Sequence, residues 1–255
     1  MSVLNILFVG SDEVARSIAK KSDSRDVDNY IYKDLKEGGL FSTISILRPN
    51  NYPDKPKPFF TSLTVSDFGI IEINKVDGVF GEVIVSMASA GIKEGLVILN
   101  ASEGEWVDDS QVKALLQQAG LSNWEFIEND GILIREKLIE VLNQIKPNED
   151  EGFVVAVDQA FTVKGVGLVA IGHVQSGKVN KHDELILAGS EGNAIARSLQ
   201  VMDLDVEVAN VGDRVGLAMR TAGPFREDLL GKGSILADSN ERFTVESKSK
   251  FKLDK

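Results

Sequence analysis

The fold is decided by the stretch DQAFTVKGVGLVAIGHV, residues 158–174. It consists of short runs of β-branched and other apolar residues, cut by glycines at close intervals, which is typical of strands joined by tight turns. Similar runs follow at 197–200 and 209–217. Residues 154–220 are therefore predicted to form a small β-barrel of roughly six strands.

The same residues carry a family resemblance. The runs VKGVG at 163–167, RSLQ at 197–200 and GDRVG at 212–216 resemble the second domain, a β-barrel, of translational GTPases of the elongation factor Tu superfamily. Within that superfamily the chain looks most similar to the archaeal selenocysteine-specific elongation factor. The match extends over roughly 85 residues with many fixed offsets, which makes it far more specific than one short motif. The resemblance implies that a GTPase-like domain precedes the barrel.

The chain before residue 147 alternates between strand-like and helix-like segments. Apolar runs predict strands at 4–9, 43–47, 69–73, 96–99 and 124–127, and helical spacing predicts helices at 11–21, 82–90, 109–119 and 132–145. Such alternation favours a mostly parallel sheet with helices on both faces. Together with the resemblance, it predicts an α/β domain like that of P-loop GTPases over residues 1–146.

The remaining boundaries follow from where the helical period ends. A polar, proline-containing stretch at 147–152 is predicted to be a linker, and the barrel domain is expected over 153–238. Residues 239–255 form a C-terminal tail that holds a cluster of lysines, which we interpret as a solvated terminus.

Composition excludes several classes of function. The 39 acidic and 28 basic residues give a formal net charge of -11, so phosphate backbones repel the chain on average and any RNA contact requires a local basic patch. We expect no DNA binding. The lack of cysteine and the presence of only His173 and His182 exclude a disulfide framework and make a thiolate or histidine metal site unexpected. No apolar run is long enough to span a membrane, so we expect a cytoplasmic protein.

The first nucleotide-binding loop of the superfamily is altered at 10–17. In a P-loop, Gly-x-x-x-x-Gly-Lys-Ser/Thr wraps backbone N–H groups around the phosphates, the lysine neutralises the terminal oxygens and the hydroxyl binds magnesium. The sequence GSDEVARS keeps Gly10 and Ser17, but the second glycine is Ala15 and the lysine is Arg16. Two carboxylates also stand within this loop, where they oppose an anionic ligand.

The second loop, which reads Asp-x-Pro-Gly-His in the family, corresponds to LRPNN at 47–51. The family uses the aspartate for the magnesium shell, the glycine to sense the γ-phosphate and the histidine to position the attacking water. Only Pro49 is kept. The 25 residues between Ser17 and Thr43 also leave little room for the long first switch of elongation factors.

Guanine recognition lacks most of its residues as well. A literal Asn-Lys-x-Asp occurs at 74–77, but its register in the alternating pattern favours a polar turn after a buried strand over a base-binding loop. The register places the guanine loop at 100–103, where Asn100 is kept but alanine and glutamate replace the lysine and aspartate. The last loop reads ENDG at 128–131 in place of the family's Ser-Ala pair.

Together these changes predict a domain that keeps the GTPase fold and has lost GTP hydrolysis. Such a pseudo-GTPase has no catalytic residue, no cofactor and no metal. The alternative is a divergent GTP-binding protein or GTPase with translation elongation factor activity, which binds GTP and magnesium. In that case Gly10, Arg16, Ser17 and Asn100 still contact the nucleotide.

The barrel supplies the candidate partner-binding residues. In the family this barrel contacts the small ribosomal subunit and the aminoacyl end of tRNA, so the resemblance implies an RNA-facing surface near Lys164, Arg197 and Arg214. Structural ion pairs are an equally valid interpretation of these three side chains. The expected partner is the ribosome, tRNA or another translation factor, and a protein-interaction module without an RNA role is a further alternative. Because the sequence lacks the family's third domain, we do not expect it to deliver tRNA on its own.

Overall fold

The structure is a computed structural model that describes residues 3–35, 41–100, 106–144 and 152–240. The chain divides into two compact units, residues 1–146 and 147–255. Among the described residues, no helix is both long and apolar enough to cross a membrane. The lysine cluster of the tail and all but one residue of the predicted linker lie outside the described residues.

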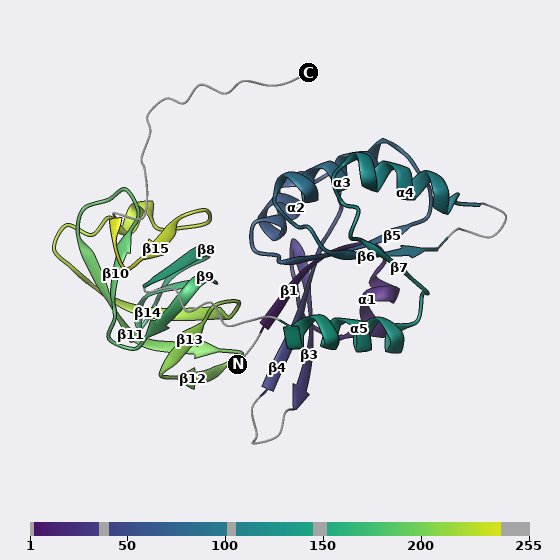
Figure 1. Cartoon of the computed structure of the whole chain (residues 1–255). Helices are drawn as coiled ribbons and strands as arrows, with labels where there is room; N and C mark the ends of the chain where they lie inside the picture. The colour runs from purple at the N-terminus through teal and green to yellow at the C-terminus, as the bar shows by residue number, and fades with distance from the viewer. Residues whose placement is uncertain (1–2, 36–40, 101–105, 145–151, 241–255) are drawn as a thin grey trace, which may run out of the picture. The chain divides into compact units, whose positions relative to one another are not determined.

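A seven-stranded sheet forms the centre of the first unit, in the order β2-β3-β4-β1-β5-β6-β7 (Figure 1). The parallel strands are β4 (Phe41–Pro49), β1 (Val3–Val9), β5 (Phe68–Ile73), β6 (Gly95–Leu99) and β7 (Glu125–Ile127). At one edge, β3 (Val27–Leu35) runs antiparallel to β4, and β2 (Lys20–Ser24) runs antiparallel to β3.

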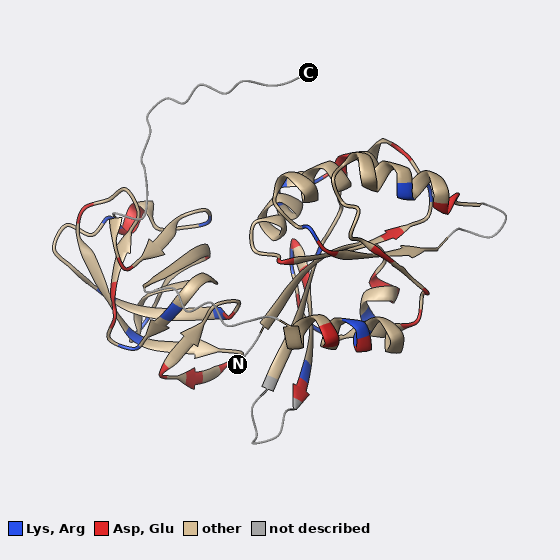
Figure 2. Ribbon diagram, viewed as in Figure 1, with Lys and Arg blue, Asp and Glu red and all other residues tan. Residues whose placement is uncertain are grey.

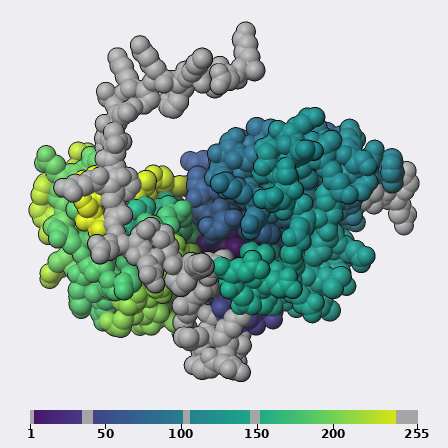
Figure 3. Space-filling view, viewed as in Figure 1, coloured from purple at the N-terminus to yellow at the C-terminus, as the bar shows by residue number. Residues whose placement is uncertain are grey.

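Helices cover both faces of this sheet. One face is covered by α1 (Asp12–Ile18) and α5 (Gly131–Gln144), and the other by α2 (Pro56–Leu63), α3 (Gly78–Ser89) and α4 (Asp109–Gln118). In the space-filling view the blue and teal segments that hold α2, α3 and α4 form a continuous layer (Figure 3).

Strand β1 contributes to the cores on both faces. Ile6 and Phe8 pack with α1 and α5, whereas Leu7 packs with α2 and α3. A parallel strand that is buried on both faces must be apolar throughout, and this explains why β1 reads as one continuous apolar run.

The predicted fold class is confirmed, and the structure adds three elements that the apolar pattern did not predict. These are the hairpin of β2 and β3 and the helix α2. The predicted helix at 11–21 ends at Ile18, because Ala19 has an extended backbone and the chain then enters β2. The hairpin therefore fills most of the stretch between Ser17 and Thr43.

The second unit is an antiparallel barrel. Its closed ring has the order β10-β15-β8-β9-β14-β11, and pairing of β10 with β11 completes it. The ring strands are β8 (Phe153–Val163), β9 (Gly167–Asn180), β10 (Glu184–Leu187), β11 (Asn193–Val201), β14 (Arg214–Ala222) and β15 (Ile235–Ala237). Two short strands, β12 (Leu204–Val206) and β13 (Val208–Asn210), pair with β11 and β9. Closure leaves the ring without an open sheet edge.

Glycines at two places let β8 and β9 adopt their geometry. A Cβ atom on Gly172 would lie 2.4 Å from the backbone oxygen of Ala156, so only glycine fits where these strands approach each other. In the turn between them, Gly165 and Gly167 have φ angles of 85° and 103°, which L side chains rarely adopt.

Candidate functional site

The candidate nucleotide site lies at the edge of the sheet where the parallel strands end. Ligands of open α/β sheets bind outside the carboxyl ends of the strands. The predicted contacts Gly10, Arg16 and Ser17 follow β1, and Asn100 follows β6. The rest of the predicted guanine loop, residues 101–103, lies outside the described residues.

The first loop is much shorter than a P-loop. Helix α1 begins at Asp12, so only Gly10 and Ser11 separate it from β1. Ser11 is its N-cap: the Val14 N–H donates to the Ser11 hydroxyl over 3.2 Å, and the Ala15 N–H donates to the Ser11 carbonyl over 3.3 Å. Backbone donors that would surround a phosphate in a P-loop are thus used within the helix.

A carboxylate of the protein occupies the place beside this loop. Glu72, on β5, accepts a hydrogen bond from the Ser11 N–H at 2.6 Å and from the Asn100 side-chain amide at 2.5 Å. It also lies so close to Gly10 that a Cβ atom there would be 2.7 Å from the Glu72 Cβ atom. Two of the predicted nucleotide contacts, Gly10 and Asn100, are therefore in contact with one glutamate.

Arg16 and Ser17 are bound within the protein too. The Arg16 guanidinium forms an ion pair with Asp12 one helical turn away, although 55% of its side chain is exposed. The Ser17 hydroxyl donates to the Val14 carbonyl over 2.7 Å. Neither side chain points its functional group toward an open phosphate position.

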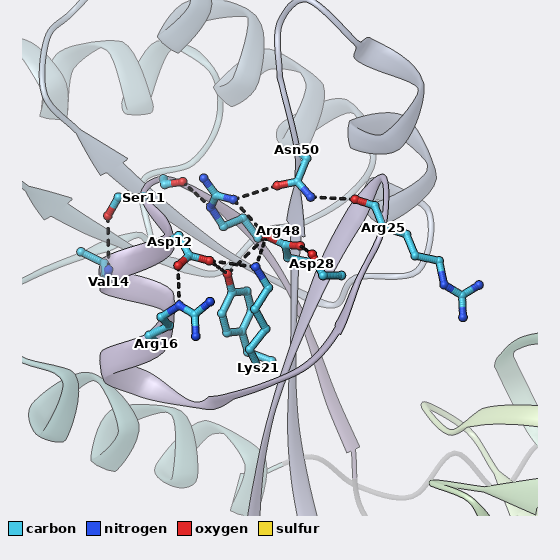
Figure 4. Close-up of polar contacts among 12 residues, drawn as sticks. Ser11, Asp12, Val14, Arg16, Lys21, Arg25, Asp28, Arg48 and Asn50 are labelled. Atoms are coloured by element: carbon cyan, nitrogen blue, oxygen red, sulfur yellow. Dashed lines mark hydrogen bonds and ion pairs between the residues drawn. The ribbon is translucent and has the colours of Figure 1, made fainter.

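Asp12 is the centre of a polar network that extends to the hairpin (Figure 4). Its carboxylate accepts hydrogen bonds from the Tyr30 hydroxyl at 2.5 Å and from the Lys21 ammonium at 3.0 Å. The Tyr30 hydroxyl, followed by Arg16 and Lys21, holds the pKa of the Asp12 carboxyl well below its ordinary value. Burial, followed by the bond to Asp12, raises the pKa of Tyr30 to about 12.

The network continues through Asp28 to the second predicted loop. Lys21 donates to Asp28 over 2.7 Å, and Arg48 donates to it over 3.3 Å. Arg48 also donates to the Gly10 carbonyl at 2.7 Å and to the Asn50 side chain at 2.9 Å. Burial alone would raise the pKa of Asp28, but the bonds from Lys21 and other donors outweigh it and lower the pKa. The two degenerate loops are thus joined by side chains.

Sequence reasoning did not identify Glu72, Asp28 or Tyr30 as parts of this site. One signal pointed to Glu72: it is a charged residue in a strand, FGIIEI, that is otherwise apolar or glycine. Asp28 and Tyr30 had no such signal, because their strand, VDNYIYKDL, mixes polar and apolar residues. Their partners lie on other elements, up to 61 positions away for the bond between Glu72 and Ser11.

The segment 74–77 caps a helix. The Asp77 carboxylate accepts from the Phe80 N–H at 3.0 Å as the N-cap of α3, and Lys75 forms an ion pair with it at 3.0 Å. These contacts agree with the interpretation of this segment as a polar turn. Asp130, in the predicted base-contact loop, similarly accepts from the backbone N–H groups of Ile132 and Leu133 at the start of α5.

In the barrel, two of the three predicted basic residues meet at one turn. Lys164 is exposed in the turn between β8 and β9, and Arg197 donates to the Val166 carbonyl of the same turn over 3.1 Å. Arg197 stands at the irregularity of β11 between Ala196 and Ser198.

Arg214 lies apart from these two. It pairs with His173 in the register of β14 and β9, and its guanidinium bonds to Asp158 at 3.1 and 3.2 Å. His173 is almost fully buried, and burial, followed by the charge of Arg214, lowers its pKa to about 3. Arg214 therefore forms a structural ion pair. Within the described part of both units, no group of three or more His, Cys, Asp or Glu residues is arranged to hold a metal.

Comparisons with known proteins place this geometry in context. No protein-family model matches the chain. The uncharacterized protein MJ0325 of Methanocaldococcus jannaschii is 32% identical over 241 residues, which are 94% of this chain and 73% of that protein. The selenocysteine-specific elongation factor of Escherichia coli is 33% identical over 137 residues, 51% of this chain and 22% of that factor.

Among solved structures, translation elongation factor SelB from Methanococcus maripaludis in complex with the GTP analogue GPPNHP aligns with a TM-score of 0.72 at 20% identity. The alignment covers 94% of this chain and 56% of that one. A bacterial selenocysteine-specific elongation factor aligns with a TM-score of 0.72 at 17% identity, over 92% of this chain and 45% of its own. The chain thus spans about half the length of these factors and shares their fold over that half.

Proposed function

Because the chain belongs to one family with protein MJ0325 and has the fold of elongation factor Tu-like translational GTPases, we propose that it is a translation-associated pseudo-GTPase. It binds the ribosome, tRNA or another translation factor through its barrel, and it does not hydrolyse GTP.

The main support for a loss of nucleotide binding is the hydrogen bond from the Ser11 N–H to the Glu72 carboxylate. A P-loop offers such N–H groups to phosphate oxygens. Here the Glu72 carboxylate accepts from the Ser11 N–H, and its negative charge repels a phosphate nearby. The early start of α1 at Asp12 removes further donors from the loop.

The loss of hydrolysis follows from the second loop. A hydrolysing site needs a magnesium partner and a group that positions water. At the positions of the family's aspartate and histidine stand Leu47, whose apolar side chain is buried, and Asn51, which is exposed. Between them, Arg48 is bound to Asp28 and the Gly10 carbonyl, and Asn50 donates to the Arg25 carbonyl at 2.8 Å. These side chains hold the loop to the hairpin and offer no group for either task.

We define the barrel-turn surface as Phe161, Lys164, Val166 and Arg197. Phe161 and Val166 are 42% and 40% exposed, and both cations are exposed beside them. Exposed apolar side chains next to cations suit a partner that offers both phosphates and flat or apolar surface, as RNA and ribonucleoprotein do. Arg214 is left out of this surface because its charge is paired with Asp158.

The first test is calorimetric titration of nucleotide-free protein with GTP, GDP and ATP in the presence of magnesium. We expect no heat of binding even at roughly millimolar nucleotide. Binding of GTP at about micromolar concentration, abolished by Arg16→Ala and unaffected by Lys113→Ala on α4, would establish the divergent GTP-binding protein instead.

The second test measures co-sedimentation with archaeal ribosomes and retention of labelled tRNA. Lys164→Ala combined with Arg197→Ala is expected to weaken binding to one of them by about tenfold, as expected for two lost charged contacts. The matched control, Lys178→Ala with Lys232→Ala, removes two exposed lysines elsewhere on the same unit and should change little. Equal binding by both double variants would contradict the assignment of the barrel-turn surface.

A further inference from the structure

A basic groove opens on the first unit and shares only Arg16 with the predicted nucleotide contacts. It has a volume of about 480 Å³ and lies where α1 passes into β2, beside β3 and α5. Figure 2 shows basic segments on both α5 and β3. Five of its nine lining residues are cationic, and none is acidic. These cations are Arg16, Lys20, Lys21, Lys33 and Arg135.

This concentration of positive charge contrasts with the rest of the chain, which has a net charge of -11. A local patch of opposite sign in an acidic protein focuses the electrostatic field on one class of ligand. The groove also falls within the roughly 300–1,000 Å³ typical of ligand pockets. Its lining therefore selects for an anion of about nucleotide size or larger.

Among the described residues, Arg135, Lys20 and Lys33 are not neutralised by a carboxylate, whereas the other two cations are. Arg16 and Lys21 are ion-paired with Asp12. Arg135 instead donates to backbone carbonyls, to Ile18 at 2.7 Å and to Ser17 at 2.9 Å, and these bonds do not neutralise its charge. Lys20 and Lys33 are exposed, and within the described part of the chain neither forms an ion pair.

The groove also contains a flat surface. The Arg135 guanidinium lies 4.8 Å from the centroid of the Tyr32 ring, and both residues line the groove. Bases of single-stranded RNA stack on aromatic rings and on guanidinium planes, while lysines beside them contact the phosphates. An acidic peptide would use the cations but has no need of the ring.

We propose that this groove binds single-stranded RNA at the edge of β3. Lys20 and Lys33, on one face of the hairpin, contact phosphates, and Tyr32 with Arg135, on the other face, stacks against a base. The site is separate from the barrel-turn surface and does not depend on the partner proposed for it. It gives the first unit, which has no open phosphate nest, a role in contacting RNA.

The test is fluorescence anisotropy of a labelled oligouridylate of about 12 nucleotides, within the usual site size of single-strand binders, with the full chain. Salt is varied from about 50 to about 200 mM. Lys20→Ala with Lys33→Ala should weaken binding by on the order of tenfold and reduce the slope of log K against log salt by about 1.4, or 0.7 per lost phosphate contact. Tyr32→Ala should weaken binding at least about fivefold with the slope unchanged, because stacking releases no counterions.

The matched control is Lys57→Ala with Lys93→Ala, which removes two exposed lysines from α2 and from the segment before β6. Any of three results would overturn the proposal. The first is an equal loss of binding in this control, and the second is an unchanged salt slope in Lys20→Ala with Lys33→Ala. The third is displacement of the RNA by polyglutamate as effectively as by unlabelled RNA. Loss of binding only in Lys164→Ala with Arg197→Ala would place the RNA on the barrel and also overturn it. Circular dichroism of each variant checks that it is folded.

Discussion

At the scale of single residues, Glu72 connects two of the loops that form the candidate nucleotide site. Its carboxylate joins the end of β1 to the end of β6 by accepting from Ser11 and from Asn100. A charged acceptor that satisfies two partly buried donors contributes more than a neutral one. Glu72 is therefore expected to stabilise the fold at this edge.

Glu72→Ala is expected to lower the free energy of unfolding by about 1–3 kcal/mol, because two donors lose their acceptor. It should not create GTP binding, since α1 still begins at Asp12. Urea denaturation and calorimetry check the two parts. Glu94→Ala, an exposed glutamate before β6, is the control and should change stability little. A variant as stable as the parent would contradict the structural role of Glu72.

The bond between Tyr30 and Asp12 predicts a specific dependence of stability on pH. The pKa of Asp12 is lowered in the folded state from its ordinary value of 3.8, so its stabilising contribution is present above that value and is lost as pH falls below it. Tyr30→Phe removes the first of the donors that lower this pKa. We expect a loss of about 1–2 kcal/mol at neutral pH, which remains at pH 3, because Asp12 is still ionised in the folded protein at that pH.

Urea denaturation of Tyr30→Phe at both pH values checks this expectation. Tyr32→Phe, on the same strand, removes a hydroxyl without changing the contacts of Asp12 and serves as the control. A loss of stability in Tyr30→Phe that is present at neutral pH and already absent at pH 3 would mean that Asp12 is protonated in the folded protein at pH 3 and that its pKa is not lowered.

At the scale of elements, the sequence predicted strands and helices wherever packing follows a simple period. Strand β1 is apolar because it is buried on both faces, and α5 repeats buried residues at helical spacing. The sequence of β2, KKSDS, has no apolar residue, since it is an edge strand held by pairing with β3 alone. Helix α2 contains Pro56 and Pro58 in its first turn, where proline is tolerated but where it normally signals a loop.

For the candidate site, the sequence predicted where the residues lie but not what they contact. The positions of Gly10, Arg16, Ser17 and Asn100 at the strand ends follow from the order of the elements. What these residues contact depends on the register of strands far apart in the chain, as for Glu72 on β5. No local pattern contains that information.

The close approach of β8 and β9 gives a prediction at this scale. Gly172→Ala should destabilise the barrel by roughly 2 kcal/mol or more, because the added Cβ atom would lie 2.4 Å from the Ala156 carbonyl oxygen and the strands must separate. Gly216→Ala, in the neighbouring strand β14, is the control, since the nearest atoms to its Cβ atom lie at 3.9 Å. Thermal unfolding of both variants checks this, and equal stability would refute the steric argument.

At the scale of the whole molecule, the chain shares the fold of selenocysteine-specific elongation factors although its loops differ in sequence from the nucleotide-binding motifs. An identity of 20% with a GTP-analogue-bound factor is sufficient to keep the arrangement of strands and helices, because that arrangement depends on the apolar cores. Those cores are separate: one lies in the barrel and two lie on the faces of the sheet. Each unit therefore has the apolar packing that an independently folding domain needs.

Separate cores predict that the two units unfold in separate transitions, and the chain contains a natural reporter for one of them. Both tryptophans, Trp106 and Trp124, lie in the first unit. Gly172→Ala should therefore lower the midpoint of barrel unfolding, followed by hydrogen exchange of peptides from β8 and β9, and leave the tryptophan fluorescence midpoint unchanged. A fluorescence midpoint that falls together with the exchange midpoint would mean that the units unfold as one, and that stabilising contacts join them beyond those of their separate cores.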